Sequence, residues 1–368
     1  MNVFKIALLG SAALVAASVG ARADSLEALK SSMNDLTIGA VADAPAAAAP
    51  ATVIAWSGRV RAGVVTQYNA PNASTGQYRT DIVANTGLYW AATTQTAVGE
   101  VGVGGGIVGG ANSQVGVAGA GLAGINNGYL GGNATVTTDG FSGWWKMTPN
   151  LTLRGGVLGN LSKSSYSWDA AATNWYAAKT GGGVTASSLN GDPAAVQIAY
   201  ADGPLGFAVQ VEDSNNGGGA ALGSLGNNSA FGVTAKASYK MDAIGFDLSG
   251  GYWGDAWSSM PGWSVNGGLG YSAGPFSVGA AIGTGVKIGS TTTYTPGSAY
   301  AKLGLSDSAR IEMGVTRDFA TGANVTTFGG GIYYSPAKQI TLGAEAGYVA
   351  NGANDGSYSA ALISAFTF

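Results

Sequence analysis

The chain has 368 residues, a formal net charge of −3 and only 10% charged residues, against about 25% in typical soluble domains. It contains neither cysteine nor histidine, which excludes a disulfide framework, thiolate chemistry and the usual histidine-based acyl-transfer triad. No basic tract suggests nucleic-acid binding, and the 46% of hydrophobic residues are spread in alternation with polar ones.

Residues 1–23 have the pattern of a secretory signal peptide. Lys5 supplies the positive start, residues 6–19 form an apolar centre, and Ala21-Arg22-Ala23 is a small-x-small cleavage site. The alternative is a retained anchor helix, but the apolar run is short for crossing a bilayer. We therefore expect the segment to be removed.

Residues 24–52 differ in composition from all that follows. Apolar residues fall at heptad spacing at Leu26, Leu29, Met33 and Leu36. Asp24 with Glu27 could cap a short helix, although one and a half heptads cannot form a stable coiled coil alone. We expect a periplasmic N-terminal arm with an Ala/Pro tether at 44–50; pairing within a trimer is the alternative.

From Ile54 onward the apolar period is two, which is typical of strands. In the first strand Trp56, Val60 and Val64 share one face, and Arg59 and Arg61 share the other. The charged face must line something wet while the apolar face meets lipid. Aromatic residues stand at the two ends of the apolar stripe, where membrane interfaces favour them.

This alternation repeats as hairpins through residue 368. Turn residues mark short connections at 92–95, 148–150, 202–204, 241–243, 273–275, 306–308 and 335–338. Longer polar connections lie at 69–77, 110–128, 160–193, 214–228, 255–261, 289–296, 320–323 and 350–355. The expected fold is all-β: a transmembrane antiparallel β-barrel over residues 53–368, with about 16 strands, short periplasmic turns and long extracellular loops.

The fourth strand, residues 136–147, departs from the regular alternation. Val136 and Phe141 are out of phase there, which predicts a β-bulge or a shifted boundary. The Gly/Val run at 99–110 lacks the GK[ST] ending of a phosphate loop, and no helical pattern follows it. It predicts a strand whose smooth inner face allows a loop or a neighbouring subunit to approach closely.

The last strand, residues 356–368, has an apolar stripe that includes Tyr358, Leu362 and Phe366 and ends on Phe368. It resembles the C-terminal strand of bacterial outer-membrane barrel proteins, whose terminal Phe is recognised by the barrel assembly machinery. An ordinary terminal strand of a soluble sandwich is the alternative.

The longest connection, 160–193, is the third on the long side. It resembles the third loop of trimeric general porins, which folds into the barrel and constricts it; an external loop over the mouth or over a trimer neighbour is the alternative. Its charged residues are Lys163, Asp169, Lys179 and Asp192. Its aromatic residues, which could pack on the inner wall, are Tyr166, Trp168, Trp175 and Tyr176.

Charged residues on the inward parity are the candidate pore lining. The cations are Arg59, Arg61, Arg79, Arg154, Lys236, Lys302 and Arg310. The anions are Asp81, Glu100, Glu212, Asp247, Glu312 and Glu345. Opposite charges across a narrow wet gap create a transverse field that sets ion preference, whereas local ion pairs would contribute little.

Ser57-Gly58-Arg59-Val60-Arg61-Ala62-Gly63, with the leader and the Ala-rich tether, resembles the general porins of alphaproteobacteria. The resemblance implies a homotrimeric channel for passive diffusion of small hydrophilic solutes and ions, surrounded by outer-membrane lipid and lipopolysaccharide. The alternatives are a channel selective for a sugar or an anion, and a non-conducting adhesin or structural barrel. We expect no enzymatic activity and no cofactor, because no catalytic motif is present and no ligand spacing specifies loop-bound Ca²⁺.

Overall fold

The computed structural model describes residues 51–69, 77–112, 135–159, 161–168, 193–213, 231–254, 261–287, 290–319, 325–350 and 356–368. All of them belong to the compact unit Ala51–Phe368. The predicted signal peptide and the predicted arm up to residue 50 lie outside the described residues. No helix in the described ranges is long and apolar enough to cross a membrane.

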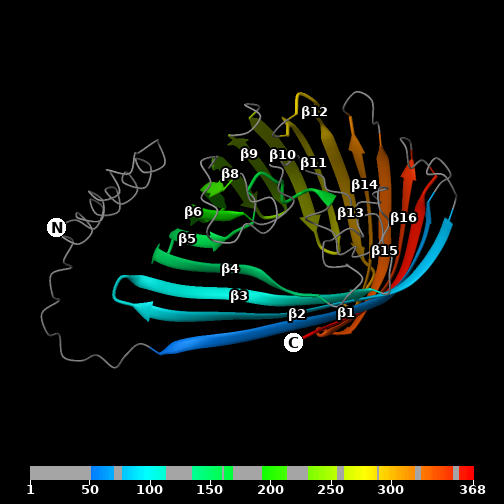
Figure 1. The fold of residues 1–368 in the computed structure, drawn as a ribbon, viewed down its shortest axis with the longest axis horizontal. Coiled ribbons are helices and arrows are strands. Elements are labelled where there is room, and N and C mark those ends of the chain that lie inside the picture. Colours follow the sequence, from blue (N-terminus) through cyan, green and yellow to red (C-terminus); the bar gives the residue numbers. More distant parts are fainter. Residues whose placement is uncertain are drawn as a thin grey trace, which may run out of the picture. The chain divides into compact units, whose positions relative to one another are not determined.

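The described secondary structure is a single antiparallel sheet (Figure 1). Its strands are β1 (Thr52–Asn69), β2 (Gln77–Thr96), β3 (Gly99–Asn112), β4 (Thr135–Thr148), β5 (Leu151–Val157), β6 (Ala194–Asp202), β7 (Leu205–Asp213), β8 (Phe231–Met241), β9 (Ile244–Trp253), β10 (Gly262–Ala273), β11 (Phe276–Val286), β12 (Thr293–Tyr294), β13 (Pro296–Gly304), β14 (Ala309–Asp318), β15 (Thr326–Ala337), β16 (Ile340–Ala350) and β17 (Tyr358–Thr367). The short strand β12 and the following strand β13 both pair with β11, so together they occupy one position in the wall. The 17 strands therefore occupy sixteen positions. The expected count of about sixteen is confirmed.

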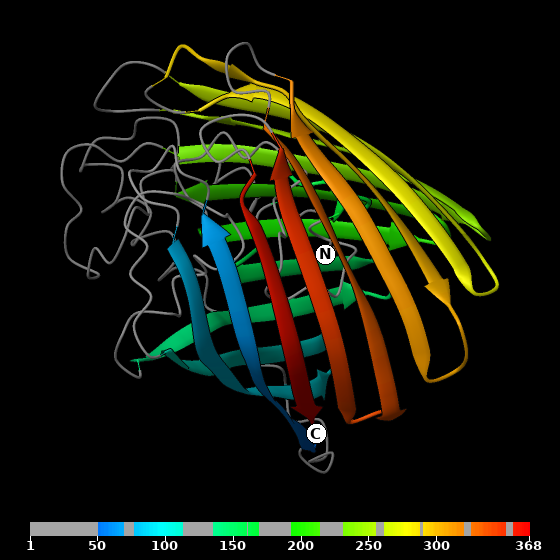
Figure 2. The same cartoon turned by 90° about the vertical axis from the view of Figure 1, so that its right-hand side faces the viewer.

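The sheet closes on itself between its first and last strands. β1 pairs antiparallel with both β2 and β17, with Arg59 opposite Thr367 and Tyr68 opposite Tyr358 (Figure 2). The Gly58 N–H donates to the Phe368 carbonyl at 3.2 Å, and the Phe368 N–H donates back to the Gly58 carbonyl at 3.1 Å. Closure matters because each unpaired backbone group exposed to lipid costs several kcal/mol.

The strands alternate between an apolar outer face and an inner face of polar and small residues, as the sequence predicts. On β9, Phe246 is 51% exposed whereas its neighbour Asp247 is 3% exposed. Aromatic pairs stack on the outer face near both ends of the wall: Tyr68 with Tyr358 at the long-connection end, and Tyr239 with Phe246 at the short-turn end. Such aromatic girdles are the signature of a barrel that crosses a bilayer.

The short and long connections alternate around the barrel, and one predicted turn is wrong. Residues 92–95 are part of β2, which continues to Thr96 and turns at residues 97–98. The Thr96 hydroxyl donates to the Gly99 carbonyl at 2.6 Å and accepts from the Val98 N–H at 3.2 Å. Gly99 adopts a φ of +114°, so the turn needs glycine there, while Thr93 and Thr94 favour an extended strand.

The irregularity predicted in the fourth strand is confirmed. The β3–β4 register shifts between Gly104 and Gly106, and Gly140 on β4 has a φ of +61°. The inner face of β3 is not left bare, however, because the Trp144 ring of β4 lies over Gly102. The Trp144 indole N–H donates to the Glu100 carboxylate at 3.3 Å, so glycine on β3 makes room for a tryptophan of the same wall.

Candidate functional site

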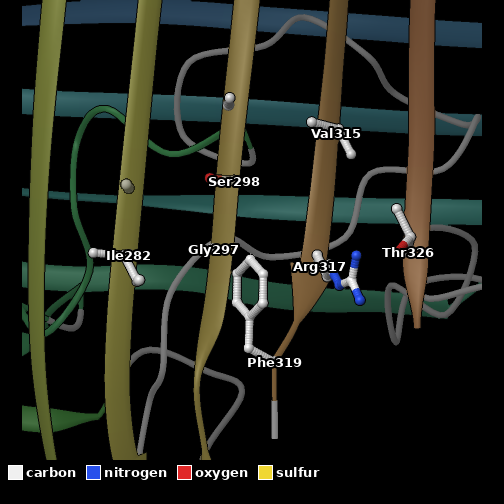
Figure 3. Close-up of a pocket in the computed structure, with 9 residues that line it drawn as sticks. Ile282, Gly297, Ser298, Val315, Arg317, Phe319 and Thr326 are labelled. Atoms are coloured by element: carbon white, nitrogen blue, oxygen red, sulfur yellow. The ribbon is translucent and has the colours of Figure 1, made fainter. Parts of the chain in front are cut away.

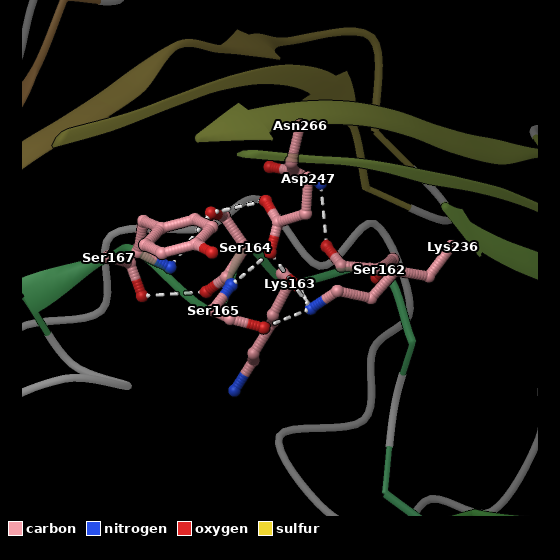
Figure 4. Close-up of polar contacts among 9 residues, drawn as sticks. Ser162, Lys163, Ser164, Ser165, Ser167, Lys236, Asp247 and Asn266 are labelled. Atoms are coloured by element: carbon pink, nitrogen blue, oxygen red, sulfur yellow. Dashed lines mark hydrogen bonds and ion pairs between the residues drawn. The ribbon is translucent and has the colours of Figure 1, made fainter. Parts of the chain in front are cut away.

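The candidate functional site is the inner face of the barrel together with residues 161–168, which follow β5 and lie against that face (Figure 4). Asp247 of β9 is the principal anchor. Its carboxylate accepts a hydrogen bond from the Ser164 hydroxyl at 2.6 Å and another from the Ser165 N–H at 2.6 Å. Asp247 is 3% exposed, so these bonds form away from bulk water, where charge-assisted hydrogen bonds are strong.

Lys236 of β8 completes this anchor from the neighbouring strand. Its ammonium group lies 3.2 Å from the Asp247 carboxylate and donates to the Lys163 carbonyl and the Ser165 hydroxyl, each at 2.7 Å. One strand farther on, the Asn266 amide of β10 donates to the Ser162 carbonyl at 2.6 Å. Three adjacent strands therefore bind consecutive residues of the segment, which fixes its path across the inner wall.

Two aromatic side chains of the segment pack on glycines of the wall. A Cβ atom at Gly245 or Gly270 would collide with the Tyr166 side chain, and one at Gly314 would collide with the Trp168 ring. Trp168 is completely buried, and its backbone N–H donates to the Ser298 hydroxyl at 3.1 Å. The wall glycines thus provide space for aromatic side chains from the connection. Burial, with a smaller contribution from Asp247, raises the pKa of Tyr166 above its ordinary value.

A buried polar network adjoins the beginning of the segment. The Glu212 carboxylate of β7 accepts hydrogen bonds from Gln210 at 2.7 Å, from Thr234 at 3.3 Å and from the Trp253 indole N–H. The Gln210 amide also donates to the Gly159 carbonyl at 3.4 Å. Glu212 faces inward as predicted, but it is only 2% exposed. Its carboxylate therefore stabilises the wall through these hydrogen bonds and does not contact water in the bore.

Arginines line other parts of the inner wall, and two of them lie opposite this anchor. Arg59 and Arg61 lie on β1, eight strand positions from β9, so in a ring of sixteen they stand across the barrel from Asp247. The Arg59 guanidinium lies 5.4 Å from the centre of the Tyr89 ring. Arg154 of β5 is opposite the inward-facing Trp144 and Gln197, and it is exposed.

Two more predicted lining residues can be placed only by backbone register. Arg79 of β2 is opposite Gln67, and Asp81 is opposite Val65, on the inward parity of β1. Asp169 and Lys179 fall outside the described residues. Arg59 and Arg61 are opposite Gly87 and Asn85, so Arg79 lies six residues, or about 20 Å, farther along the strand than Arg61. The hairpin therefore places these residues on one face, but it does not bring Arg79 or Asp81 beside the two arginines of β1.

The predicted residues Arg310 and Glu312 form a separate cluster with groups on neighbouring strands. The Arg310 Nε atom donates to the Glu312 carboxylate at 2.9 Å, and the Lys302 ammonium lies 3.8 Å from the same oxygen. Arg310 also lies 4.8 Å from the centre of the Tyr333 ring, and the Tyr333 hydroxyl donates to Glu345 at 3.0 Å. These charges are locally paired, which is the alternative that the sequence left open for them.

Inward aromatic residues on the strands are part of the site that the sequence reasoning missed. Tyr89, Trp144, Trp253 and Tyr333 all contact inward charged residues. Their parity could have revealed them, because each occupies the same face of its strand as a charged partner or as the residue paired with it. The sequence analysis assigns aromatic residues to the membrane interfaces of the outer face, so it does not predict these four inward-facing side chains.

The site thus consists of a closed barrel, a charged inner wall and residues 161–168, which are bound to that wall from within. No protein-family model and no curated protein matches the chain. Solved structures of several variants of the porin from Rh. blastica do match: two of them have 17% and 16% identity, each with a TM-score of 0.59 over 86% of this chain and 100% of that chain. The chain therefore has the fold of these bacterial porins.

Proposed function

We propose that this protein is a porin of the bacterial outer membrane, forming a water-filled channel for passive diffusion of small hydrophilic solutes and ions. The observation that carries this proposal is the closed wall of sixteen positions with an apolar outer face and a charged inner face. A barrel of this size encloses an aqueous channel rather than a packed core.

The connection at 160–193 is the constriction in this proposal. Support comes from residues 161–168, which are held to β8, β9 and β10 by hydrogen bonds and an ion pair on the inner face. The narrow passage would then lie between this segment and the arginines of β1. We infer that Arg59, Arg61 and Arg154 give the passage a preference for anions, because their positive charges attract anions into a confined aqueous space. Arg79, near the start of β2, would add positive charge closer to the long-connection rim.

A sugar-selective channel is the second candidate that the aromatic connection suggested. Trp168 argues against a role in sugar stacking, because the ring is completely buried against the wall and offers no face to a solute. The general channel is therefore the proposal we favour. It includes no enzymatic activity and no cofactor.

The proposal also covers location and partners. A porin acts in the outer membrane, in contact with lipid and lipopolysaccharide, and the homotrimer implied by the family resemblance belongs to it. Phe368 is 72% exposed, its backbone is hydrogen-bonded to Gly58, and one side of its ring packs over Gly58. Recognition of this residue by the barrel assembly machinery is part of the proposal.

Conductance in a planar bilayer tests the proposal. Purified protein in detergent should insert with stepwise, ohmic conductance, and proteoliposomes should swell in small sugars at rates that fall with sugar size. A barrel that inserts without conducting would overturn the channel and favour an adhesin or structural role. Block of the current by one sugar or anion at micromolar concentration would favour a selective channel instead.

A further inference from the structure

One basic side chain on the strands breaks the inward rule. Arg317 of β14 is opposite Gly297 of β13, which is opposite the outward-facing Ile282 of β11. Residues that pair across antiparallel strands share a face, so Arg317 points outward. Among the lysines and arginines of the described strands, it alone is on the lipid side.

The position of Arg317 makes this charge tolerable. It is the next-to-last residue of β14 and precedes the connection at 319–325, so it lies at the long-connection rim. A basic residue on the lipid face costs about 2–4 kcal/mol at the bilayer midplane but only about 0–1 kcal/mol near the interface. Arg317 is thus at the level of the headgroups of the outer leaflet, given the proposed orientation.

Within the described ranges, no ion pair includes Arg317. Its neighbour Asp318 is on the opposite parity and accepts a hydrogen bond from the Thr295 N–H at 3.4 Å. The adjoining segments 288–289 and 320–324 contain no acidic residue in their sequence. The guanidinium lies over the face of Phe319, whose ring centre is 5.4 Å away.

An apolar groove of about 460 Å³ begins beside this guanidinium (Figure 3). Gly297 and Ala299 of β13 belong to its lining, and Ile282, Val315 and Phe319 border it. The Phe319 ring lies over Gly297, with one ring atom 2.9 Å from where a Cβ atom would stand, so glycine makes room for the ring that forms one side of the groove. The groove therefore joins a headgroup-level cation to a depression on the lipid side.

We propose that this groove is a binding site for the lipid A part of lipopolysaccharide, with a phosphate on Arg317 and an acyl chain against Ala299 and Val315. A guanidinium binds a phosphate through two parallel charge-assisted hydrogen bonds, and the stacked Phe319 ring holds it in position. The lipid-side groove fits a hydrocarbon chain rather than a polar partner. Because the groove lies at the long-connection rim, the lipid that reaches it comes from the outer leaflet. This step rests on the proposed outer-membrane location.

Binding of defined lipids to the full-length detergent-solubilised protein, measured by native mass spectrometry, tests the site. The probes are bisphosphorylated lipid A, the same lipid without phosphates, and phosphatidylglycerol. We expect Arg317→Gln to weaken lipid A binding about tenfold, the order expected for a lost charge-assisted pair, and Arg317→Lys to recover part of it. Ala299→Leu should weaken binding of both lipid A forms by filling the groove.

The matched control is Lys338→Gln, which removes a cation in the exposed turn between β15 and β16. Unchanged lipid A binding by Arg317→Gln, or equal binding of phosphatidylglycerol and lipid A by the unchanged protein, would overturn the proposal. Loss of oligomers in Arg317→Gln would also overturn it and identify a second copy of the chain as the occupant. Channel conductance of these variants should stay normal, so failure of the lipid site is distinguishable from failure of the proposed channel.

Discussion

Asp247→Asn should release residues 161–168 from the inner wall. The carboxylate accepts two hydrogen bonds of 2.6 Å and pairs with Lys236 at 3.2 Å. Each hydrogen bond to a charged group is worth about 1.5–3 kcal/mol, and asparagine keeps one neutral acceptor. We therefore expect a loss of about 2–4 kcal/mol of docking free energy, which raises the undocked population roughly 30- to 900-fold.

Hydrogen exchange at the Ser165 amide measures this population, because that N–H is bonded to Asp247 and exchanges when the segment undocks. Exchange in Asp247→Asn should accelerate by the same factor, and single-channel recordings should show more open-channel noise. The control is Asp307→Asn, in the exposed turn between β13 and β14, which should change neither. Exchange at Ser165 within threefold of the unchanged protein, in a variant that still folds, would refute the anchoring argument.

Three further predictions concern the wall and its closure. Replacing Arg59 and Arg61 together by serine should shift the reversal potential in a salt gradient toward cations, and an unchanged potential would exclude them from the lining. Gly314→Leu should displace the buried Trp168 ring and raise open-channel noise, whereas Gly155→Leu, with open space at its Cβ position, should not; equal noise in both would contradict the role of Gly314. Deleting Phe368 removes both hydrogen bonds to Gly58 and should lower the temperature at which the barrel unfolds in detergent; an unaltered melting temperature would count against that closure.

The alternation of apolar and polar residues was enough to predict the wall of the barrel. A strand shifted by one residue would turn its charged side chains toward lipid, which is energetically costly. The alternation placed Arg59, Arg61 and Arg310 inward, and the same parity places Arg317 outward. The turn at residues 97–98 was missed because it depends on a positive φ at Gly99 and on the Thr96 hydroxyl rather than on a cluster of turn residues.

The docking of the connection could be predicted only in outline. Aromatic character suggested that Tyr166 and Trp168 pack on the wall, but their glycine partners lie on β9, β10 and β14, far away in the sequence. The ion pair of Lys236 with Asp247 follows from their inward parity on adjacent strands. The hydrogen bonds from Ser164 and Ser165 to Asp247 could not be predicted in the same way. No periodic pattern in the sequence specifies which backbone or hydroxyl groups of a loop face the wall.

The central claim is that successive residues of a strand face lipid and water in turn, and the absence of cysteine makes it directly measurable. Single cysteines would be introduced one at a time along β1, at positions 59–65, in protein reconstituted into vesicles. A charged, membrane-impermeant thiol reagent should modify Arg59→Cys and Arg61→Cys rapidly, while a fluorophore on Val60→Cys or Val64→Cys should be quenched by spin-labelled lipid. Uniform labelling along the strand, or quenching by lipid at positions 59 and 61, would contradict the account.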